Sequence, residues 1–285
     1  MVYQLNNISV NYADHVALQN LTCTLPEGKW ISVIGPTGAG KSTFVQVLKG
    51  LIPNVKGDYL IHGQPVNRDA KGQLKVIPEI GFVFQYPEHQ LFETTVYKEL
   101  AFALNQQGAS HQQMKEAIER ILPQVGLSKD ILPLSPFQLS GGEKRRVAIA
   151  SVMMMNPKLF ILDEPTAGLD PASQKAVLKL LKNWQEQNNH TIVFVSHHME
   201  DVAEYSDEVI VIHEGQLKGQ YDTKTLFLEK EDWLSKLGLS VPESVQLLKL
   251  MEELSGQKIE VAGCREQDIF EAILPIWHSR GDRHG

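Results

Sequence analysis

The chain has 285 residues, of which 42% are hydrophobic and 21% are charged, a composition typical of a globular protein with a substantial core. This length favours one large domain with a smaller unit, and a net charge of −7 argues against a dedicated nucleic-acid binder. The two cysteines, Cys23 and Cys264, lie far apart and form no metal-ligand spacing, so a reducing, cytosolic compartment is expected.

Neither a secretory leader nor a membrane span is expected. The first residues, MVYQLNNISVNY, lack the charged and apolar regions of a signal peptide. The longest apolar run, Val147 to Met155, is far shorter than the ~18 residues that a spanning helix needs. We therefore expect a protein that does not cross a membrane by itself but that can dock onto one that does.

Short apolar runs alternate with helical segments along the chain. Two early segments, Tyr3 to Val10 and Leu18 to Leu25, alternate apolar and polar residues and predict antiparallel strands at one edge of the sheet. Later runs lack this alternation, which predicts strands buried on both faces of a parallel sheet. These runs are Trp30 to Ile34, Ile80 to Phe84, Leu159 to Leu162, Thr191 to Val195 and Val209 to Ile212. The chain is expected to be an α/β protein.

The middle and the end of the chain read as helical. The pattern from Val96 to Met155 predicts a helical insertion that splits the α/β core. Beyond about Tyr221 the spacing i, i+3, i+4, i+7 predicts an amphipathic helix, with Gly256 as its C-cap. The apolar residues of this spacing are Leu247, Leu250, Met251 and Leu254. A second short helix is expected from Gln267 to Leu274, ahead of Pro275.

The stretch ISVIGPTGAGKSTF is a strand, a glycine-rich loop and the start of a helix. Gly35, Gly40, Lys41 and Ser42 fit the pattern G-x-x-x-x-G-K-[ST]. Glycines let backbone N–H groups turn inward around phosphate oxygens, and the helix adds its positive end. The lysine reaches the β- and γ-phosphates and the serine hydroxyl can bind Mg²⁺. An ordinary glycine turn is the alternative, which the preceding apolar run disfavours.

The stretch KLFILDEPTAGLD brings two carboxylates to the end of a buried strand. The strand is expected to deliver Asp163 to the carboxyl edge of the sheet, beside the glycine-rich loop, where it can bind Mg²⁺. Glu164 is one step further out and can orient or deprotonate a water that attacks a γ-phosphate. A solvated turn before Pro165 is the alternative, and the phosphate loop makes it the weaker one.

The stretch QLSGGEKRRVAIA predicts a second anion site at a helix start. Ser140, Gly141 and Gly142 expose backbone N–H groups there, and Glu143 stands in the first turn. Because the chain already has one phosphate loop, a second site makes sense if it caps a nucleotide held by another subunit. An ordinary serine N-cap with glutamate at N3 is compatible with this role.

With these motifs in family order, the chain resembles the ABC-type ATPases from about Tyr3 to Gly219. The motifs are GPTGAGKS, LSGGE, LFILDE, AGLD ending at Asp170, and VSHHM with a switch histidine at His197. The resemblance implies a P-loop NTPase core with an antiparallel β edge subdomain, an inserted helical subdomain and a small C-terminal helical extension. It implies an ATPase domain over residues 1–220, with core 1–86 and 157–220 and helical subdomain 87–156, and an extension over 221–285.

The resemblance also implies two such ATPases paired head to tail around two ATP molecules, with Mg²⁺. Tyr12 would stack on the adenine, Glu164 would be the catalytic base, Gln85 would touch the metal and the water, and His197 would contact the γ-phosphate. Metal ligands would be Ser42, Gln85 and Asp163. Other nucleotide contacts would come from Gly35, Pro36, Thr37, Gly38, Ala39, Gly40, Lys41, Ser42, Thr43, Ser140, Gly141, Gly142, Glu143 and Asp170. His198 receives no role.

One departure from the family pattern stands in the signature motif. Many relatives have glutamine where this chain has Glu143, and a negative charge near phosphates is less welcome than an amide. The affinity of the site that this signature completes in a partner therefore stays open.

The segment QYPEHQLFETTV resembles the Q-loop region of the ATP-binding subunits of energy-coupling factor transporters, and most resembles the second ATPase of a heterodimer. The resemblance implies that Leu91 and Phe92 anchor a helix of a transmembrane coupling subunit docking near Gln85 to Thr95; the alternative is burial of both within the helical subdomain. It also implies that the C-terminal extension helps to hold the two ATPases together, unless it is a self-packed cap.

The implied function is that of a peripheral ATPase on the cytoplasmic face of the cell membrane, which energises an importer of vitamins or metal ions and meets the substrate-binding membrane subunit only indirectly. The nearest alternative is the ATPase of a conventional binding-protein-dependent ABC importer. Soluble ABC ATPases of DNA repair or translation usually carry coiled-coil insertions or two nucleotide domains, and a P-loop kinase would need neither LSGGE nor the Asp170 loop. The transported substrate stays undetermined.

Overall fold

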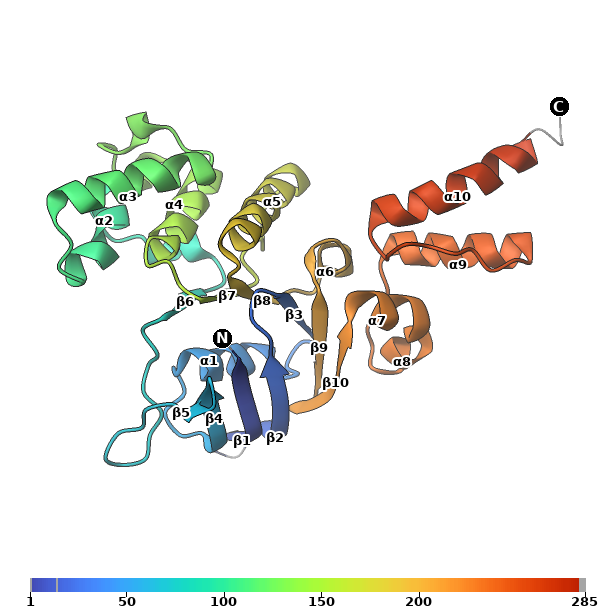
Figure 1. Ribbon diagram of the computed structural model, residues 1–285, viewed down its shortest axis with the longest axis horizontal. Helices are drawn as coiled ribbons and strands as arrows, with labels where there is room; N and C mark the ends of the chain where they lie inside the picture. The colour runs from blue at the N-terminus through green and yellow to red at the C-terminus, as the bar shows by residue number, and fades with distance from the viewer. Residues whose placement is uncertain (1, 14, 282–285) are drawn as a thin grey trace.

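Figure 1 shows the computed structural model, which describes residues 2–13 and 15–281, with the backbone alone for 278–281. Two sheets form its centre. One group of helices, α2 to α4, extends to one side of them, and the C-terminal helices α7 to α10 lie on the other side.

The first sheet is antiparallel and four-stranded, in the order β2-β1-β4-β5. Its strands are β1 (Tyr3–Tyr12), β2 (His15–Leu25), β4 (Lys56–Ile61) and β5 (Gln64–Pro65). The predicted pair of antiparallel strands is confirmed, but it does not lie at an edge of the parallel sheet. It forms a sheet of its own because β1 pairs with β4 on its other side. The apolar face of this sheet packs on α1 (Lys41–Lys49) and on one face of the second sheet.

The second sheet has six strands in the order β10-β9-β3-β8-β7-β6, all parallel except the hairpin of β9 and β10. Its strands are β3 (Trp30–Ile34), β6 (Ile80–Val83), β7 (Leu159–Asp163), β8 (Thr191–Val195), β9 (Glu208–His213) and β10 (Gln216–Asp222). The five predicted runs are confirmed within one residue at each end. Along β3, Ile31 packs with the first sheet and α1, whereas Trp30 packs with helices on the opposite face. Burial on both faces explains why these runs do not alternate.

The helical insertion between β6 and β7 is confirmed. It consists of η1 (Pro87–Gln90), α2 (Val96–Gln106), α3 (His111–Gln124), η2 (Lys129–Ile131), η3 (Pro136–Gln138) and α4 (Gly141–Met153). Side-chain caps begin its main helices, since Thr95, Ser110 and Ser140 each accept a hydrogen bond from a backbone N–H of the first turn. Its core is continuous with Val83 and Phe160 of the sheet and with α5 (Pro171–Asn188).

The C-terminal elements pack against β9 and α6 (Met199–Tyr205) through a third core cluster. They are α7 (Thr223–Glu229), α8 (Glu231–Lys236), α9 (Glu243–Ser255) and α10 (Glu266–Gly281). The predicted amphipathic helix is α9, and Gly256 ends it in the left-handed region with φ of 67°. No helix in the described part of the chain is long and apolar enough to cross a bilayer.

Two details of the C-terminal prediction are wrong. The buried face of α9 is Val245, Leu248 and Met251, while Leu250 and Leu254 are 51% and 58% exposed. The helix has apolar residues on two neighbouring faces, and the face that contacts α10 and the core is the one that is buried. Helix α10 also continues through Pro275. The carbonyl that loses its amide partner there belongs to Glu271, an exposed residue, so water can solvate it.

A buried histidine makes the fold sensitive to acid. His190 is 1% exposed, its Nε2 lies 2.9 Å from Asn156 Oδ1, and its ring packs 4.5 Å from that of Trp184. Its Nδ1 has no partner in the described structure. Burial, with a smaller contribution from Lys158, lowers the pKa of His190 from 6.5 to about 4.

The unfolded chain therefore binds a proton at His190 below about pH 6.5, while the folded chain does so only near pH 4. The folded state loses stability as the pH falls between these values. Through this group we expect the free energy of unfolding to drop by up to about 2 kcal/mol from pH 7 to pH 5, and His190→Gln to remove that part of the drop. Urea titrations at both pH values measure it, and equal losses in the two proteins would contradict the expectation.

Candidate functional site

The glycine-rich loop joins β3 to α1 and needs glycine at both ends. Gly35 has φ of 156° and Gly40 has φ of 103°. A Cβ at Gly35 would stand 2.0 Å from the carbonyl oxygen of Ile212, and one at Gly40 would stand 2.6 Å from that of Ala17. The loop and the first helical turn therefore pack closely on β2 and β9. They consist of Gly35, Pro36, Thr37, Gly38, Ala39, Gly40, Lys41, Ser42 and Thr43. A glycine-rich loop that leads into a helix N-terminus is the arrangement that binds phosphate groups.

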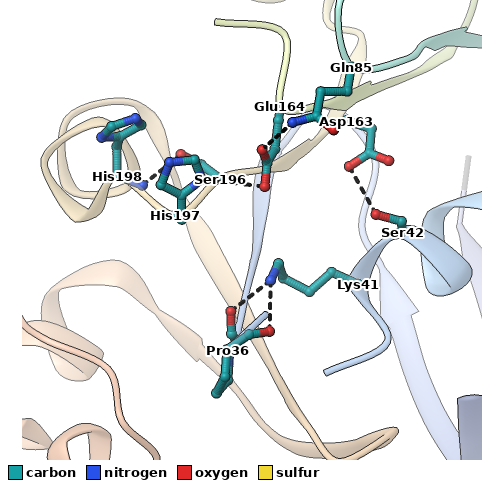
Figure 2. Close-up of polar contacts among 10 residues, drawn as sticks. Pro36, Lys41, Ser42, Gln85, Asp163, Glu164, Ser196, His197 and His198 are labelled. Atoms are coloured by element: carbon teal, nitrogen blue, oxygen red, sulfur yellow. Dashed lines mark hydrogen bonds and ion pairs between the residues drawn. The ribbon is translucent and has the colours of Figure 1, made fainter. Parts of the chain in front are cut away.

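The charged and hydroxyl groups of this loop are already ordered. Lys41 Nζ donates to the carbonyl oxygens of Gly35 at 2.7 Å and of Pro36 at 3.0 Å (Figure 2). Partial burial lowers the pKa of Lys41, and the nearby carboxylates Glu164 and Asp163 oppose this shift. The ammonium group is thus held over the mouth of the loop.

The last residue of β7 faces the loop. Ser42 Oγ donates to Asp163 Oδ1 at 3.4 Å (Figure 2). Asp163 is 8% exposed, and burial raises its pKa although the Ser42 hydrogen bond opposes the shift. A buried carboxylate beside a hydroxyl is a pair of hard oxygen donors, the kind that Mg²⁺ prefers.

Three side chains meet beside this pair. Gln85 Nε2 donates to Glu164 Oε2 at 3.0 Å, and His197 Nδ1 lies 3.3 Å from Glu164 Oε1 (Figure 2). They follow the neighbouring parallel strands β6, β7 and β8, whose carboxyl ends share one edge of the sheet. Glu164 adopts φ of 48°, a left-handed conformation that is unusual for a non-glycine residue. The three residues predicted to be catalytic are therefore brought together.

The neighbouring histidine serves a different purpose. The ring centroid of His198 lies 4.3 Å from that of His197, and the backbone N–H of His198 donates to Ser196 Oγ at 3.0 Å. His198 stands at the N-cap of α6, and its ring points away from Glu164 (Figure 2).

Tyr12 ends β1 with its ring 45% exposed, opposite His15 in the β1–β2 hairpin. The next part of β2 reaches the phosphate loop through a backbone bridge, because Gln19 N donates to Gly215 O and Gly215 N donates to Ala39 O. The exposed tyrosine thus lies on a hairpin that is tied to this loop.

The LSGGE turn is a helix start on the helical subdomain. Ser140 Oγ accepts from Glu143 N at 3.3 Å, while Glu143 Oε2 accepts from Ser140 N at 2.9 Å and from its Oγ at 2.7 Å. These hydrogen bonds lower the pKa of Glu143, so the carboxylate is ionised at neutral pH. In the described chain no hydrogen bond joins Ser140, Gly141, Gly142 or Glu143 to the phosphate loop.

Asp170 caps the N-terminus of α5, where its Oδ1 accepts from the backbone N–H groups of Ala172 and Ser173. These bonds lower its pKa. Like Ser140 and Gly141 of the LSGGE turn, Asp170 is exposed. Both features are therefore open to a second subunit.

A groove of about 440 Å³ opens beside the Q-loop region, lined by Gln90, Leu91, Phe92, Phe102, Val152 and Met155 among others. Leu91 and Phe92 do not act as a pair. Leu91 is 6% exposed and belongs to the core of the helical subdomain, whereas Phe92 is 60% exposed and packs edge-on against Phe102 at 5.0 Å. The buried Glu99 holds this loop by accepting from the N–H groups of Phe92 and Glu93 at 3.0 and 2.9 Å.

Sequence reasoning missed a buried ion pair in the same subdomain. Arg145 on α4 is 2% exposed and binds the carboxylate of Glu88 at 2.7 Å. The sequence carried no local signal for it, because Arg145 stands within the charged run EKRR and nothing nearby shows which of these residues is buried. The partner is 57 residues away in the chain and becomes visible only in the fold.

Comparison with known proteins agrees with this geometry. A sequence profile of the ABC transporter family matches residues 18–167. An energy-coupling factor transporter ATP-binding protein EcfA2 of Acetivibrio thermocellus is 41% identical over 83% of each chain. The protein of that name from Staphylococcus epidermidis is 37% identical over 98% of this chain and 99% of its own.

Solved structures give the same result for the fold. The structure of cbiO1 from Clostridium perfringens, part of the ABC transporter complex cbiONQ, has a TM-score of 0.74 and 33% identity, covering 87% of this chain and 98% of its own. MJ0796, a bacterial ABC transporter cassette solved as a dimer, has a TM-score of 0.68 and 26% identity, covering 78% of this chain and 99% of its own.

Proposed function

Since this chain belongs to the ABC transporter family, among the ATP-binding proteins of energy-coupling factor transporters, we propose that it binds ATP with Mg²⁺ between its phosphate loop and the signature turn of a second ATPase subunit. Hydrolysis there would drive a membrane-embedded importer of vitamins or metal ions. The observation that carries the proposal is the convergence of Gln85, Glu164 and His197 beside Lys41 and the Ser42–Asp163 pair.

The loop from Gly35 to Thr43 would hold the phosphates through its N–H groups and the N-terminus of α1. Lys41 would exchange its two carbonyl partners for β- and γ-phosphate oxygens, which offer an ammonium group full negative charges. The exposed ring of Tyr12 would stack on the adenine.

Ser42, Asp163 and Gln85 would hold Mg²⁺ with oxygen donors, directly or through water. The ion would supply charge neutralisation at the β- and γ-phosphates. It would also favour the ionised form of Asp163, whose pKa burial raises.

Glu164 would take the proton of the attacking water, while Gln85 orients that water and His197 donates a hydrogen bond to the γ-phosphate. The contacts that Glu164 Oε1 and Oε2 make with His197 and Gln85 hold the carboxylate in the free chain. Binding of the γ-phosphate would draw His197 away and leave Glu164 free to act as a base.

The turn from Ser140 to Glu143 and the Asp170 loop would complete the nucleotide site of the second ATPase subunit, and that subunit's signature would complete this one. Ser140, Gly141 and Asp170 are exposed, and Ser140 stands at a helix N-terminus. We propose that the partner is similar to this chain but not identical. The relatives of this chain are named EcfA2, and the number distinguishes this ATP-binding protein from another one of the same kind. Residues 1–220 would form the ATPase domain, and the extension over 221–285 would add to the contact between the two subunits.

The transmembrane coupling subunit would dock in the groove near Gln85 to Thr95, with Phe92 and Phe102 as the exposed aromatic contacts. In this arrangement the chain would be a peripheral subunit at the cytoplasmic face of the cell membrane. Nucleotide-driven closure of the two ATPases would swing the helical subdomains and move the docked helices.

The catalytic base can be tested by Glu164→Gln, which keeps the size of the side chain and one acceptor oxygen but removes the basic carboxylate. We expect ATP affinity within about threefold of the original and turnover reduced by about a hundredfold or more, because a general base is worth roughly 10²–10⁴ in rate. Phosphate release and equilibrium binding of labelled ATP measure the two quantities. Unchanged turnover would remove Glu164 from the role.

The docking groove can be tested by Phe92→Asp, which replaces an exposed aromatic ring with a carboxylate and leaves the buried core residues unchanged. We expect at least a tenfold loss of membrane-subunit capture in detergent pull-downs, while ATP binding is retained. Phe137→Asp is the matched control, because Phe137 is 69% exposed on the same subdomain but outside the groove. Equal capture by the two variants would refute the groove assignment.

The signature departure can be tested by Glu143→Gln, which keeps an acceptor for the cap of Ser140 but removes a negative charge near the partner's γ-phosphate. In a Glu164→Gln background, where ATP persists, we expect pairing with the second ATPase at roughly three- to tenfold lower ATP concentration. Size-exclusion chromatography across an ATP series measures this. Glu119→Gln, an exposed change on α3, is the control, and an unchanged or higher ATP requirement would show that the charge does not weaken the site.

A further inference from the structure

Arg145 connects two segments that are separate in the chain. Its Nε and Nη2 donate to the two carboxylate oxygens of Glu88 at 2.9 and 2.7 Å. Its Nη1 donates to the backbone carbonyl oxygens of Pro165 and Ala167 at 3.1 and 2.7 Å. One buried guanidinium therefore binds both η1 and the loop that follows β7.

Both segments lie beside residues that the proposed function uses. Glu88 lies between Gln85 of the catalytic cluster and Gln90 of the docking groove. Pro165 directly follows Glu164. On α4 itself, Ala148 and Val152 stand three and seven residues after Arg145, so they share its face of the helix, and both line the groove. The guanidinium thus joins the groove wall to the catalytic loop.

The chemistry of the contact requires arginine. Taking an ion pair out of water has a desolvation cost that a surface pair does not have. A buried ion pair is therefore weak evidence for a role in stability alone. Burial by itself would raise the pKa of Glu88, yet the hydrogen bonds from Arg145 hold it below its ordinary value. The planar fork satisfies a carboxylate and two carbonyls in fixed directions, which a lysine ammonium cannot do. The contact therefore fixes the position of η1 relative to the loop that follows β7.

We propose that Arg145 is a positioning residue for hydrolysis. It holds the loop that carries Glu164 in a position that depends on η1. Because η1 borders the groove, that position also depends on the partner helix bound there. The inference rests on the proposed function, because it takes Glu164 as the base and the groove as the docking site. A helix that moves η1 would move Glu88, and through Arg145 the backbone at Pro165 and Ala167. Glu164 would then leave or enter its working geometry without any change in the phosphate loop.

The test uses Arg145→Lys in the full chain, purified in the complex extracted from its native membranes. The charge is retained, but a lysine cannot bind Glu88 and both carbonyls together. We expect kcat for MgATP to fall about tenfold or more while the ATP dissociation constant stays within about twofold, because small misplacement of a base affects the rate and not nucleotide binding. An unchanged kcat, or a dissociation constant that rises as much as kcat falls, would overturn the proposal.

A double variant separates positioning from general damage. If Arg145 acts through Glu164, adding Arg145→Lys to Glu164→Gln leaves the residual phosphate release, followed with γ-³²P-labelled ATP, within twofold of Glu164→Gln alone. A further tenfold loss in the double variant would show that Arg145 acts elsewhere, and would overturn the inference. If Glu164→Gln alone keeps full turnover, the base assignment fails first, so the two failures are distinguishable.

A milder variant guards against misfolding. Glu88→Gln keeps the size and one oxygen acceptor while removing the charge, so we expect the same direction of change, with kcat lowered about threefold or more. Glu119→Gln is the matched control, because it breaks the exposed ion pair with Lys129 at 3.1 Å on the same subdomain and should leave kcat unchanged. Equal effects of these two variants would overturn the proposal, and thermal unfolding of both confirms that folded proteins are compared.

Discussion

The parallel register of β6, β7 and β8 is the constraint on which the site depends. Parallel strands end at the same edge of a sheet, so the residues that follow them meet there although they are far apart in the chain. Gln85, Glu164 and His197 are brought within hydrogen-bonding distance in this way. The phosphate loop follows β3, which pairs with β8 on its other side, so Lys41 and Ser42 reach the same edge.

In the proposed function, the same arrangement would give each chain half of a nucleotide site. The phosphate loop lies at the sheet edge, while the LSGGE turn is on the helical subdomain and is occupied with its own cap. A helix start that satisfies itself is stable in the free chain, which lets the subunit fold before it meets a partner. The cap holds Glu143 against Ser140, so under the proposed function the cap and a partner's phosphate would compete for Ser140.

The helical subdomain connects this chemistry to a partner through few contacts. The groove by the Q-loop region and the catalytic loop share one helix, α4, and one buried ion pair. The groove is lined by residues of α2, η1 and α4, so a partner that docks there as proposed would contact these elements rather than the phosphate loop. Coupling between separate sites requires a rigid element, and the guanidinium of Arg145, which is itself buried, fixes Glu88, Pro165 and Ala167 through four hydrogen bonds of 2.7 to 3.1 Å.

What the sequence by itself determined is local in origin. The phosphate loop, the Ser140 cap with Glu143 and the Gly256 helix end depend on hydrogen bonds among residues a few positions apart, so short patterns describe them fully. The buried strands could be predicted because both of their faces are covered, which removes the alternation.

Only the tertiary structure decided which of several apolar surfaces is covered. It buried Leu91 and exposed Phe92, and it chose Val245, Leu248 and Met251 over Leu250 and Leu254 on α9. It also separated the first two strands into a sheet of their own and gave Arg145 its distant partner. The physical reason is that hydrophobic burial has no direction, so the choice between two apolar faces of similar size belongs to residues elsewhere in the chain that pack against them.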